Sequence, residues 1–169
     1  MSGLFGTAIS RTKKKSVEWY TPKWIFDELD IEFDLDPASP FDHETFVPAA
    51  RKLTVFDNGL ATEWHGRVFM NPPYGPETGF WMRRFIDHGN GIALVFSRTD
   101  ASWFQQAMQS CSAVLFISGR IEFVPGHENK HKTDRVGAGT AMFAFGERCS
   151  LALLRLKDHG VFIRGGRIV

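Results

Sequence analysis

The residues best suited to chemistry in this sequence are Asn71, Pro72, Pro73 and Tyr74. Neither proline has an N–H, so the backbone there can only accept hydrogen bonds, and the oxygen of the Asn side chain is a further acceptor. Two acceptors beside an aromatic ring suit a planar ligand that carries an NH₂ group, such as a nucleic-acid base. The alternative is an ordinary turn between a strand and a helix, in which the two prolines delay the helix.

The preceding segments must hold these residues in place. Residues 68–70 are apolar and bounded by glycine and proline, which predicts a short buried strand. Residues 31–36 predict another strand, and it ends in Asp36-Pro37-Ala38. This places a carboxylate at the carboxyl end of a sheet, where α/β folds bind ligands. Asp36 is therefore a candidate contact for an ammonium or a ribose hydroxyl, although an Asx turn would also explain it.

The segment between these two strands, residues 40–66, predicts a long polar and aromatic connection. Near its end lie Asp57, Asn58 and Gly59, a combination that indicates a turn before any other role. Their position just before the strand at 68–70 makes Asp57 a further candidate for a ligand contact.

A helix is expected to start at Thr21 and Pro22, because the Thr hydroxyl can cap a free N–H and proline fits the first turn. Trp19 and Tyr20 then either anchor this helix or form the wall of a pocket at its N-terminus. Further helices are predicted over residues 80–88 and 103–108.

Other apolar or alternating segments predict the rest of a sheet. Strands are expected over residues 91–97, 113–118, 140–145 and 151–156, with 119–124 as the hairpin partner of 113–118 and 161–169 as an edge. The run at 91–97 is typical of a buried parallel strand. Strands that alternate with helices indicate an α/β domain.

Composition limits the remaining classes. The 169 residues suit one domain, expected over 17–169, and a hydrophobic share of 43% is that of a globular protein. The 16 Phe and 5 Trp imply a thick core or ring surfaces for stacking. Two cysteines without metal or redox spacing indicate reduced thiols in the cytoplasm. No apolar run approaches about 18 residues, so we expect a soluble protein without a membrane span.

Nucleic-acid binding would need local basic patches, because the net charge is only +1. A flexible basic arm is expected over residues 1–16, either solvated or in contact with phosphates. A basic loop and two arginines that follow predicted strands are further candidates. The DNA-binding candidates are Lys13, Lys14, Lys15, Arg98, Arg120, Lys130, Lys132 and Arg135.

Residues 127–131 match the pattern H-E-x-x-H, in which two histidines one helical turn apart bind zinc. Pro125 and Gly126 precede the match, and no apolar stripe seats a helix there. Without a helix the two imidazoles do not share a face, so we expect a flexible polar loop and no metal site.

Taken in order over most of residues 17–145, a set of motifs resembles the phage-type DNA adenine-N6 methyltransferases, the Dam-like family. The motifs are Trp19-Tyr20-Thr21-Pro22, Phe33-Asp34-Leu35-Asp36-Pro37-Ala38-Ser39, Asp57-Asn58-Gly59-Leu60, Asn71-Pro72-Pro73-Tyr74, Ser97-Arg98-Thr99-Asp100 with Trp103-Phe104, and Gly119-Arg120-Ile121-Glu122-Phe123. The resemblance implies a Rossmann-like S-adenosylmethionine-dependent methyltransferase fold, with a mostly parallel sheet and an antiparallel C-terminal hairpin. It also implies methyl transfer from S-adenosylmethionine to the N6 amino group of adenine in DNA, in the host cytoplasm if a phage or prophage encodes the chain.

The resemblance also assigns roles. The target amine would lie against Asn71 and the carbonyl of Pro72, with Pro73 completing the motif and Tyr74 stacking on the base. The donor would lie along residues from three segments: Trp19, Tyr20, Thr21, Pro22, Asp36, Pro37, Ala38 and Asp57. In one departure from many methyltransferases, residues 37–40 replace the glycine-rich turn after the first strand. No separate recognition domain is expected, so any sequence preference would be weak, limited to a short site, or supplied by the loops at 40–66 and 125–139.

Two other kinds of function fit the same residues. The motif Asn-Pro-Pro-Tyr is shared by enzymes that methylate adenine in RNA or glutamine in proteins. A non-catalytic DNA-binding protein that keeps a degenerate donor pocket would also retain it.

Overall fold

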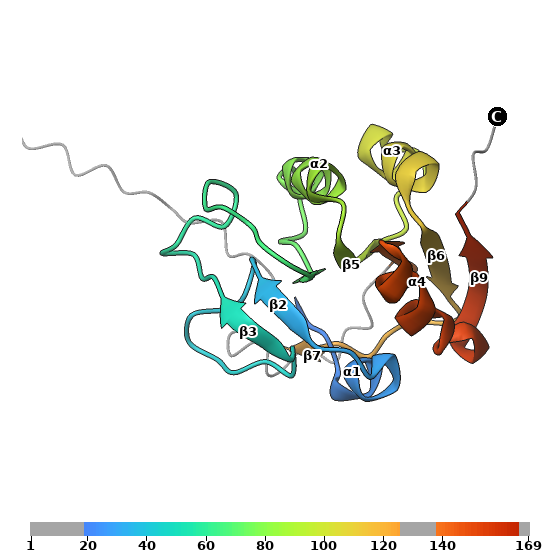
Figure 1. Cartoon of the computed structure of the whole chain (residues 1–169), viewed down its shortest axis with the longest axis horizontal. Helices are drawn as coiled ribbons and strands as arrows, with labels where there is room; N and C mark the ends of the chain where they lie inside the picture. The colour runs from blue at the N-terminus through green and yellow to red at the C-terminus, as the bar shows by residue number, and fades with distance from the viewer. Residues whose placement is uncertain (1–18, 126–137, 166–169) are drawn as a thin grey trace, which may run out of the picture.

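A seven-stranded sheet forms the centre of the structure, a computed structural model that describes residues 19–125 and 138–165 (Figure 1). The strands are β2 (Phe33–Asp36), β3 (Ala49–Lys52), β4 (Val68–Met70), β5 (Gly91–Phe96), β6 (Ala113–Ile117), β8 (Thr140–Phe145) and β9 (Gly160–Arg164). Their order is β3-β2-β4-β5-β8-β6-β9. The first four pair in parallel, β8 runs antiparallel to β5 and β6, and β9 runs antiparallel to β6. Five of these seven strands therefore point the same way, as expected for a mostly parallel sheet.

Helices cover both faces of the sheet (Figure 1). They are α1 (Lys23–Leu29), α2 (Thr78–His88), α3 (Ser102–Ser110) and α4 (Glu147–Leu154), and the 3₁₀ helix η2 (Lys157–His159) follows α4. α2 and α3 pack on one face through one apolar cluster, whereas α1 and α4 share a second cluster on the other face. A separate antiparallel pair joins β1 (Trp19–Tyr20) to β7 (Val124–Pro125). The sheet is thus buried on both sides, which leaves its strand ends available for a site.

Close packing of β4 on β5 depends on Gly91. A Cβ at this position would lie 2.1 Å from the carbonyl oxygen of Val68, and φ at Gly91 is +154°. Any larger residue would therefore push the two central strands apart. This contact helps to set the position of β4 relative to β5, and with it the position of Asn71, which directly follows β4.

Much of the expected secondary structure is confirmed. Residues 68–70, 91–96, 113–117 and 140–145 form strands, and α2 ends at Gly89 in the left-handed conformation. The edge expected at 161–169 is the strand β9 as far as Arg164, and residues 166–169 lie outside the described part.

Three predictions of secondary structure are wrong. Residues 151–156 fall mostly in α4, because Cys149, Ala152, Leu153 and Leu156 are buried at helical and not alternating spacing. Residues 119–124 do not pair with β6, which lies between β8 and β9. The expected C-terminal hairpin is therefore replaced by two antiparallel strands that flank β6.

The helix start and the connection at 40–66 also differ from expectation. Pro22 is the N-cap of α1, and the Thr21 hydroxyl makes no capping hydrogen bond. The connection contains β3, a strand missed because its residues Ala49–Lys52 are small or charged and mostly exposed.

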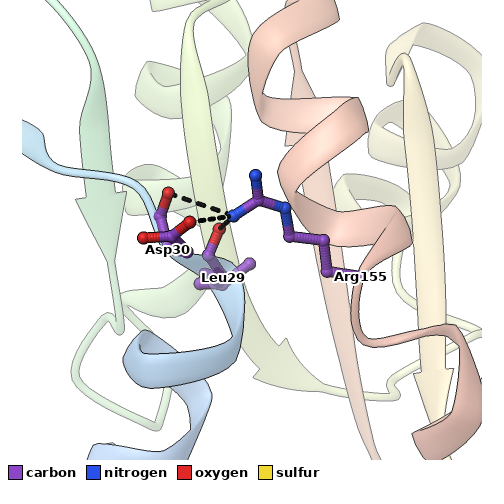
Figure 2. Close-up of polar contacts among 3 residues, drawn as sticks. All are labelled: Leu29, Asp30 and Arg155. Atoms are coloured by element: carbon purple, nitrogen blue, oxygen red, sulfur yellow. Dashed lines mark hydrogen bonds and ion pairs between the residues drawn. The ribbon is translucent and has the colours of Figure 1, made fainter.

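The C-terminal end of α1 is capped by a side chain from the C-terminal part of the chain, Arg155 (Figure 2). Arg155 Nη1 donates to the carbonyl oxygens of Leu29 and Asp30 at 3.2 and 3.3 Å and to the Asp30 carboxylate at 2.7 Å. These carbonyls have no partner inside the helix, so the guanidinium satisfies them. The contact ties α1, which follows the candidate donor residues, to the segment after α4.

None of the helices in residues 19–125 and 138–165 is long and apolar enough to cross a membrane. The same part of the chain holds no group of three or more His, Cys, Asp or Glu side chains suited to a metal. Both cysteines, Cys111 and Cys149, are free and buried, and burial raises the pKa of each thiol to about 11. They are packing residues with protonated thiols.

Candidate active site

A cavity of about 500 Å³ opens where β2, β3 and β4 end. Its walls come from residues 19–21, the turn at 36–40, the loop at 54–60, residues 71–74 and Trp81 of α2. The carboxyl ends of parallel strands are the usual ligand site of α/β sheets. The structure therefore brings most of the predicted site residues around one space. A second hollow of about 550 Å³ beside α2 contains none of them.

Hydrogen bonds at both ends orient the side-chain amide of Asn71. Its Nδ2 donates to the Trp19 carbonyl oxygen at 2.8 Å, and its Oδ1 accepts from the Tyr74 hydroxyl at 2.7 Å. A carbonyl oxygen can accept two hydrogen bonds, so Oδ1 keeps capacity for one more. The cavity thus has a fixed acceptor in its wall.

The two prolines have different roles in this loop. The Pro73 carbonyl accepts from Thr78 Oγ1 at 2.9 Å, and Thr78 Oγ1 accepts from the Gly75 N–H at 3.1 Å. This locks the loop onto the start of α2. Pro72 is buried, and its carbonyl accepts no hydrogen bond from any described residue. Pro72 therefore offers a second acceptor beside Asn71.

The ring of Tyr74 is held by two phenylalanines that the sequence reasoning missed. Tyr74 stacks on Phe96, with centroids 3.7 Å apart and planes 19° apart. Phe123 meets the Tyr74 ring at its edge, at 6.4 Å. Burial raises the pKa of the Tyr74 phenol well above its ordinary range, so the hydroxyl stays a neutral donor. A signal for Phe96 was its place at the end of the strand neighbouring β4.

Asp36 supplies a buried carboxylate at the end of β2. Its side chain is 4% exposed, and Oδ1 accepts from the Ala38 N–H at 3.1 Å. Burial raises the pKa of this carboxyl from 3.8 to about 6, and the Ala38 N–H, the Lys52 charge and Ser39 oppose the rise. Near neutral pH the cavity therefore contains a carboxylate that can bind an ammonium or hydroxyl groups.

The loop at 54–60 approaches the turn at 36–40 through Gly59. A Cβ there would lie 2.0 Å from the Pro37 carbonyl oxygen and 2.8 Å from Trp81 Cη2. Trp64 Nε1 fixes the same residue by donating to the Gly59 carbonyl at 2.7 Å. Only glycine allows this contact, which forms one side of the cavity.

Asp57 does not line the cavity, although its neighbours Thr54, Val55 and Asn58 do. Its exposed carboxylate accepts from the Thr54 N–H at 2.8 Å and from Thr54 Oγ1 at 2.9 Å. These hydrogen bonds lower the pKa of Asp57. The structure thus shows the turn role of this residue, and a contact with the donor stays a prediction. Pro22, the N-cap of α1, also lies outside the cavity wall.

Two buried polar atoms belong to residues that line the cavity. Thr21 Oγ1 and Trp81 Nε1 have no hydrogen-bond partner among the described residues, and the residues are 3% and 7% exposed. A buried polar atom without a partner is costly, so a polar ligand would compensate for it. Together with the Asp36 carboxylate and the apolar Val47, Val55 and Phe69, these atoms fit a donor that combines charged, hydroxyl and aromatic parts.

Only two of the DNA-binding candidates lie in the described part of the chain. Arg98 and Arg120 are exposed, and neither lines the cavity. The others, Lys13, Lys14, Lys15, Lys130, Lys132 and Arg135, lie outside the described residues, as does the match to the zinc pattern at 127–131.

Comparison with protein families gives one match that covers almost the whole chain. Residues 9–168 match the family model described as DNA N-6-adenine-methyltransferase (Dam). No curated protein and no solved structure matches the chain.

Proposed function

Because the chain belongs to the DNA N-6-adenine-methyltransferase (Dam) family, we propose that it transfers a methyl group from S-adenosylmethionine to the N6 amino group of adenine in DNA. Family membership implies DNA adenine-N6 methylation in general. The observation that supports the finer statement is the oriented amide oxygen of Asn71 beside the carbonyl of Pro72, which accepts no hydrogen bond from residues 19–125 or 138–165. The pair offers an acceptor for each hydrogen of an amino group.

The two acceptors address the main chemical obstacle. The lone pair of the adenine amino nitrogen is delocalised into the ring, which makes this nitrogen a poor nucleophile. Hydrogen bonds from both N–H groups to Asn71 and Pro72 favour a more pyramidal nitrogen, whose lone pair can attack a methyl carbon. When bound, S-adenosylmethionine supplies that methyl on a sulfonium.

Positioning supplies most of the expected acceleration. As the nitrogen–carbon bond forms, the carbon–sulfur bond breaks and its electron pair stays on sulfur, leaving a neutral thioether. The methylated nitrogen carries the positive charge and then loses a proton to water, so no side chain needs to act as a general base. Holding two bound reactants in line can lower the barrier by roughly 7–11 kcal/mol in well-oriented systems.

The site also suits a base taken out of a helix. An enzyme cannot reach the amino group inside a duplex, and extrusion of the nucleotide costs a few kcal/mol. Stacking on Tyr74 would offset part of that cost, since base–aromatic stacking contributes roughly 1–3 kcal/mol.

The donor side rests on the other wall of the cavity. In a Rossmann-like arrangement the donor lies over the ends of β2 and β3, where Asp36, Pro37 and Ala38 line the space with Trp19, Tyr20 and Thr21. Asp36 would bind the ammonium or the ribose hydroxyls. Thr21 Oγ1 would gain a hydrogen-bond partner.

The substitution Asn71→Ala tests the assignment. We expect methyl incorporation into DNA to fall below about one-hundredth of the wild-type rate, because one acceptor is lost and the nitrogen is misplaced. Binding of S-adenosylmethionine, measured by calorimetry, should stay within about threefold. Asn90→Ala, at an exposed asparagine that contacts Gly66, is the matched control and should keep full activity. Full activity in Asn71→Ala would contradict the proposal.

The acceptor class needs its own experiment, because the same pair would receive any planar primary amine. Labelled S-adenosylmethionine is offered with DNA, RNA or protein as the only acceptor. We expect label in DNA adenine. Label in RNA or in protein glutamine would reassign the substrate, and donor binding without transfer to any acceptor would indicate a non-catalytic DNA-binding protein.

A further inference from the structure

Three aromatic rings from separate segments meet beside the candidate acceptors. Tyr74 and Phe96 are stacked with centroids 3.7 Å apart, closer than the usual 4.5–7 Å of aromatic pairs. Phe123 meets both rings edge-on, with centroids 6.4 Å from each. Phe96 ends β5, and Phe123 directly precedes β7. One strand end and the segment leading to the small β1–β7 sheet therefore both contact the Tyr74 ring.

The two phenylalanines stand behind Tyr74 and not in the cavity. Tyr74 lines the cavity, whereas neither Phe96 nor Phe123 does. Phe96 packs instead against the apolar cluster that contains Leu94 and Met142. Its own position is fixed by the pairing of β5 with β8, in which Phe96 lies opposite Thr140. The support for Tyr74 is thus part of the rigid sheet.

The position of the Tyr74 ring also influences the orientation of the acceptor oxygen, Asn71 Oδ1. The Tyr74 hydroxyl donates to Asn71 Oδ1 at 2.7 Å, and Asn71 Nδ2 donates to the Trp19 carbonyl at 2.8 Å. If the ring tilts, the hydroxyl leaves Asn71 Oδ1 and the amide loses one of its two restraints. The position of the Tyr74 ring therefore affects both the stacking surface and the orientation of the Asn71 acceptor.

We propose that Phe96 is a positioning residue for methyl transfer, which acts only through Tyr74. This inference rests on the proposed function and extends it to a residue outside the Asn-Pro-Pro-Tyr motif. Phe96 holds the ring plane before the base arrives, so that the base meets a preset stacking surface and a preset acceptor. Phe123 closes the edge of the same stack.

The first test separates the ring from the volume it fills. Phe96→Leu keeps an apolar side chain without a planar ring, and Phe96→Tyr keeps the ring. With plasmid DNA that carries no N6-methyladenine as substrate, we expect Phe96→Leu to lower kcat by roughly 10- to 100-fold. Phe96→Tyr should retain most of the wild-type kcat. The affinity for S-adenosylmethionine should change by less than about threefold in both. Equal kcat in wild type and Phe96→Leu would overturn the inference.

A double-mutant cycle tests whether Phe96 acts through Tyr74. In a Tyr74→Leu background, Phe96→Leu should cause no further loss of kcat, because there is no ring left to hold. Losses that multiply would show an independent structural role and would overturn the inference. Phe116→Leu is the matched control, since Phe116 is a half-buried phenylalanine near the end of β6 that contacts Phe104 instead. Its effect should be small in both backgrounds.

Failure of the positioning role of Phe96 can be distinguished from failure of the proposed function. If the wild-type protein methylates DNA and Phe96→Leu does so equally well, only the positioning role fails. If the wild-type protein transfers no methyl group to DNA, the proposed function itself fails. Denaturant unfolding of each variant identifies any loss that comes from a fraction of unfolded protein.

Discussion

Asn71 has both ends of its amide engaged by the protein, and this arrangement depends on distant residues. The Trp19 carbonyl that receives its Nδ2 lies 52 positions earlier in the chain. The motif alone predicted an acceptor beside an aromatic ring. It could not predict which way the amide points, because that orientation comes from β1, and no local pattern records the approach of β1 to the loop.

Asp36 lines the cavity, and burial shifts the pKa of its carboxyl toward neutral pH. Its pKa of about 6 lies above its ordinary value of 3.8, so the folded protein binds this proton more tightly than the unfolded chain does. The favourable contribution of the protonated form is complete below about pH 4 and is lost as pH rises through about 6. Burial of the ionised carboxylate is thus a cost that the site bears at neutral pH.

Replacing Asp36 by Asn should remove that cost. We expect the free energy of unfolding of Asp36→Asn, relative to wild type, to rise between about pH 4 and about pH 7.5 by up to about 3 kcal/mol, measured by urea denaturation. Binding of S-adenosylmethionine at the higher pH should weaken. Asp42→Asn, at an exposed position, controls for the change in net charge. A difference that does not vary with pH would contradict the assigned pKa.

At the scale of elements, the cavity is formed where two turns meet. Gly59 and the Pro37 carbonyl touch because no side chain separates them, and Trp81 of α2 also lies close to Gly59. The sequence marked both segments as turns after predicted strands. Their contact was not predictable, because β3 was missed and with it the order of β2 and β3 in the sheet.

Gly59→Ala should therefore damage the donor side of the cavity more than the fold. The added methyl group would overlap the Pro37 carbonyl, so we expect a loss of about 1–3 kcal/mol in the free energy of unfolding. Affinity for S-adenosylmethionine should fall at least about tenfold as the turn at 36–40 moves. Gly139→Ala is the control, since its Cβ would meet only Ser97 Oγ at 3.9 Å. Unchanged donor affinity in Gly59→Ala would show that the turn contact does not shape the pocket.

Strand and helix predictions succeeded or failed for identifiable reasons. The runs at 68–70 and 91–96 were predictable because a strand buried on both faces is continuously apolar. Residues 151–156 were not, since a short apolar run fits a strand or a buried helix. Residues 119–124 alternate like a hairpin strand, yet only Val124 and Pro125 pair, and their partner β1 lies about a hundred residues away in the chain.

In the whole molecule, helices cover both faces of the sheet (Figure 1). The candidate site lies at the strand ends. If the candidate site carries out the proposed reaction, DNA would approach the molecule from that edge. The net charge of +1 provides little general attraction. Binding would then depend on particular basic residues, and most of the candidates lie outside the described residues.

Replacing Lys13, Lys14 and Lys15 by Gln tests the candidates in the N-terminal arm. If all three contact phosphates, the slope of log affinity against log salt should become shallower by up to about 3. Fluorescence anisotropy of labelled DNA measures the affinity at several salt concentrations. A control that replaces Arg148, Lys157 and Arg164, exposed residues in or near α4 and β9, removes the same charge and should change the slope less. Equal slopes in the two variants would exclude specific contacts by the arm.

The pairing of β1 with β7 has a consequence for the order in which activity is gained. Each strand contributes only two residues, and the pair joins Trp19 to Pro125 and Tyr20 to Val124. Closing such a long loop for so few contacts is favourable only after the core has formed. Because the Trp19 carbonyl holds Asn71, a refolding chain would recover its packed core before the Asn71 amide is oriented. If Asn71 accepts the target amine as proposed, methyl transfer would return later than the folded core after denaturation.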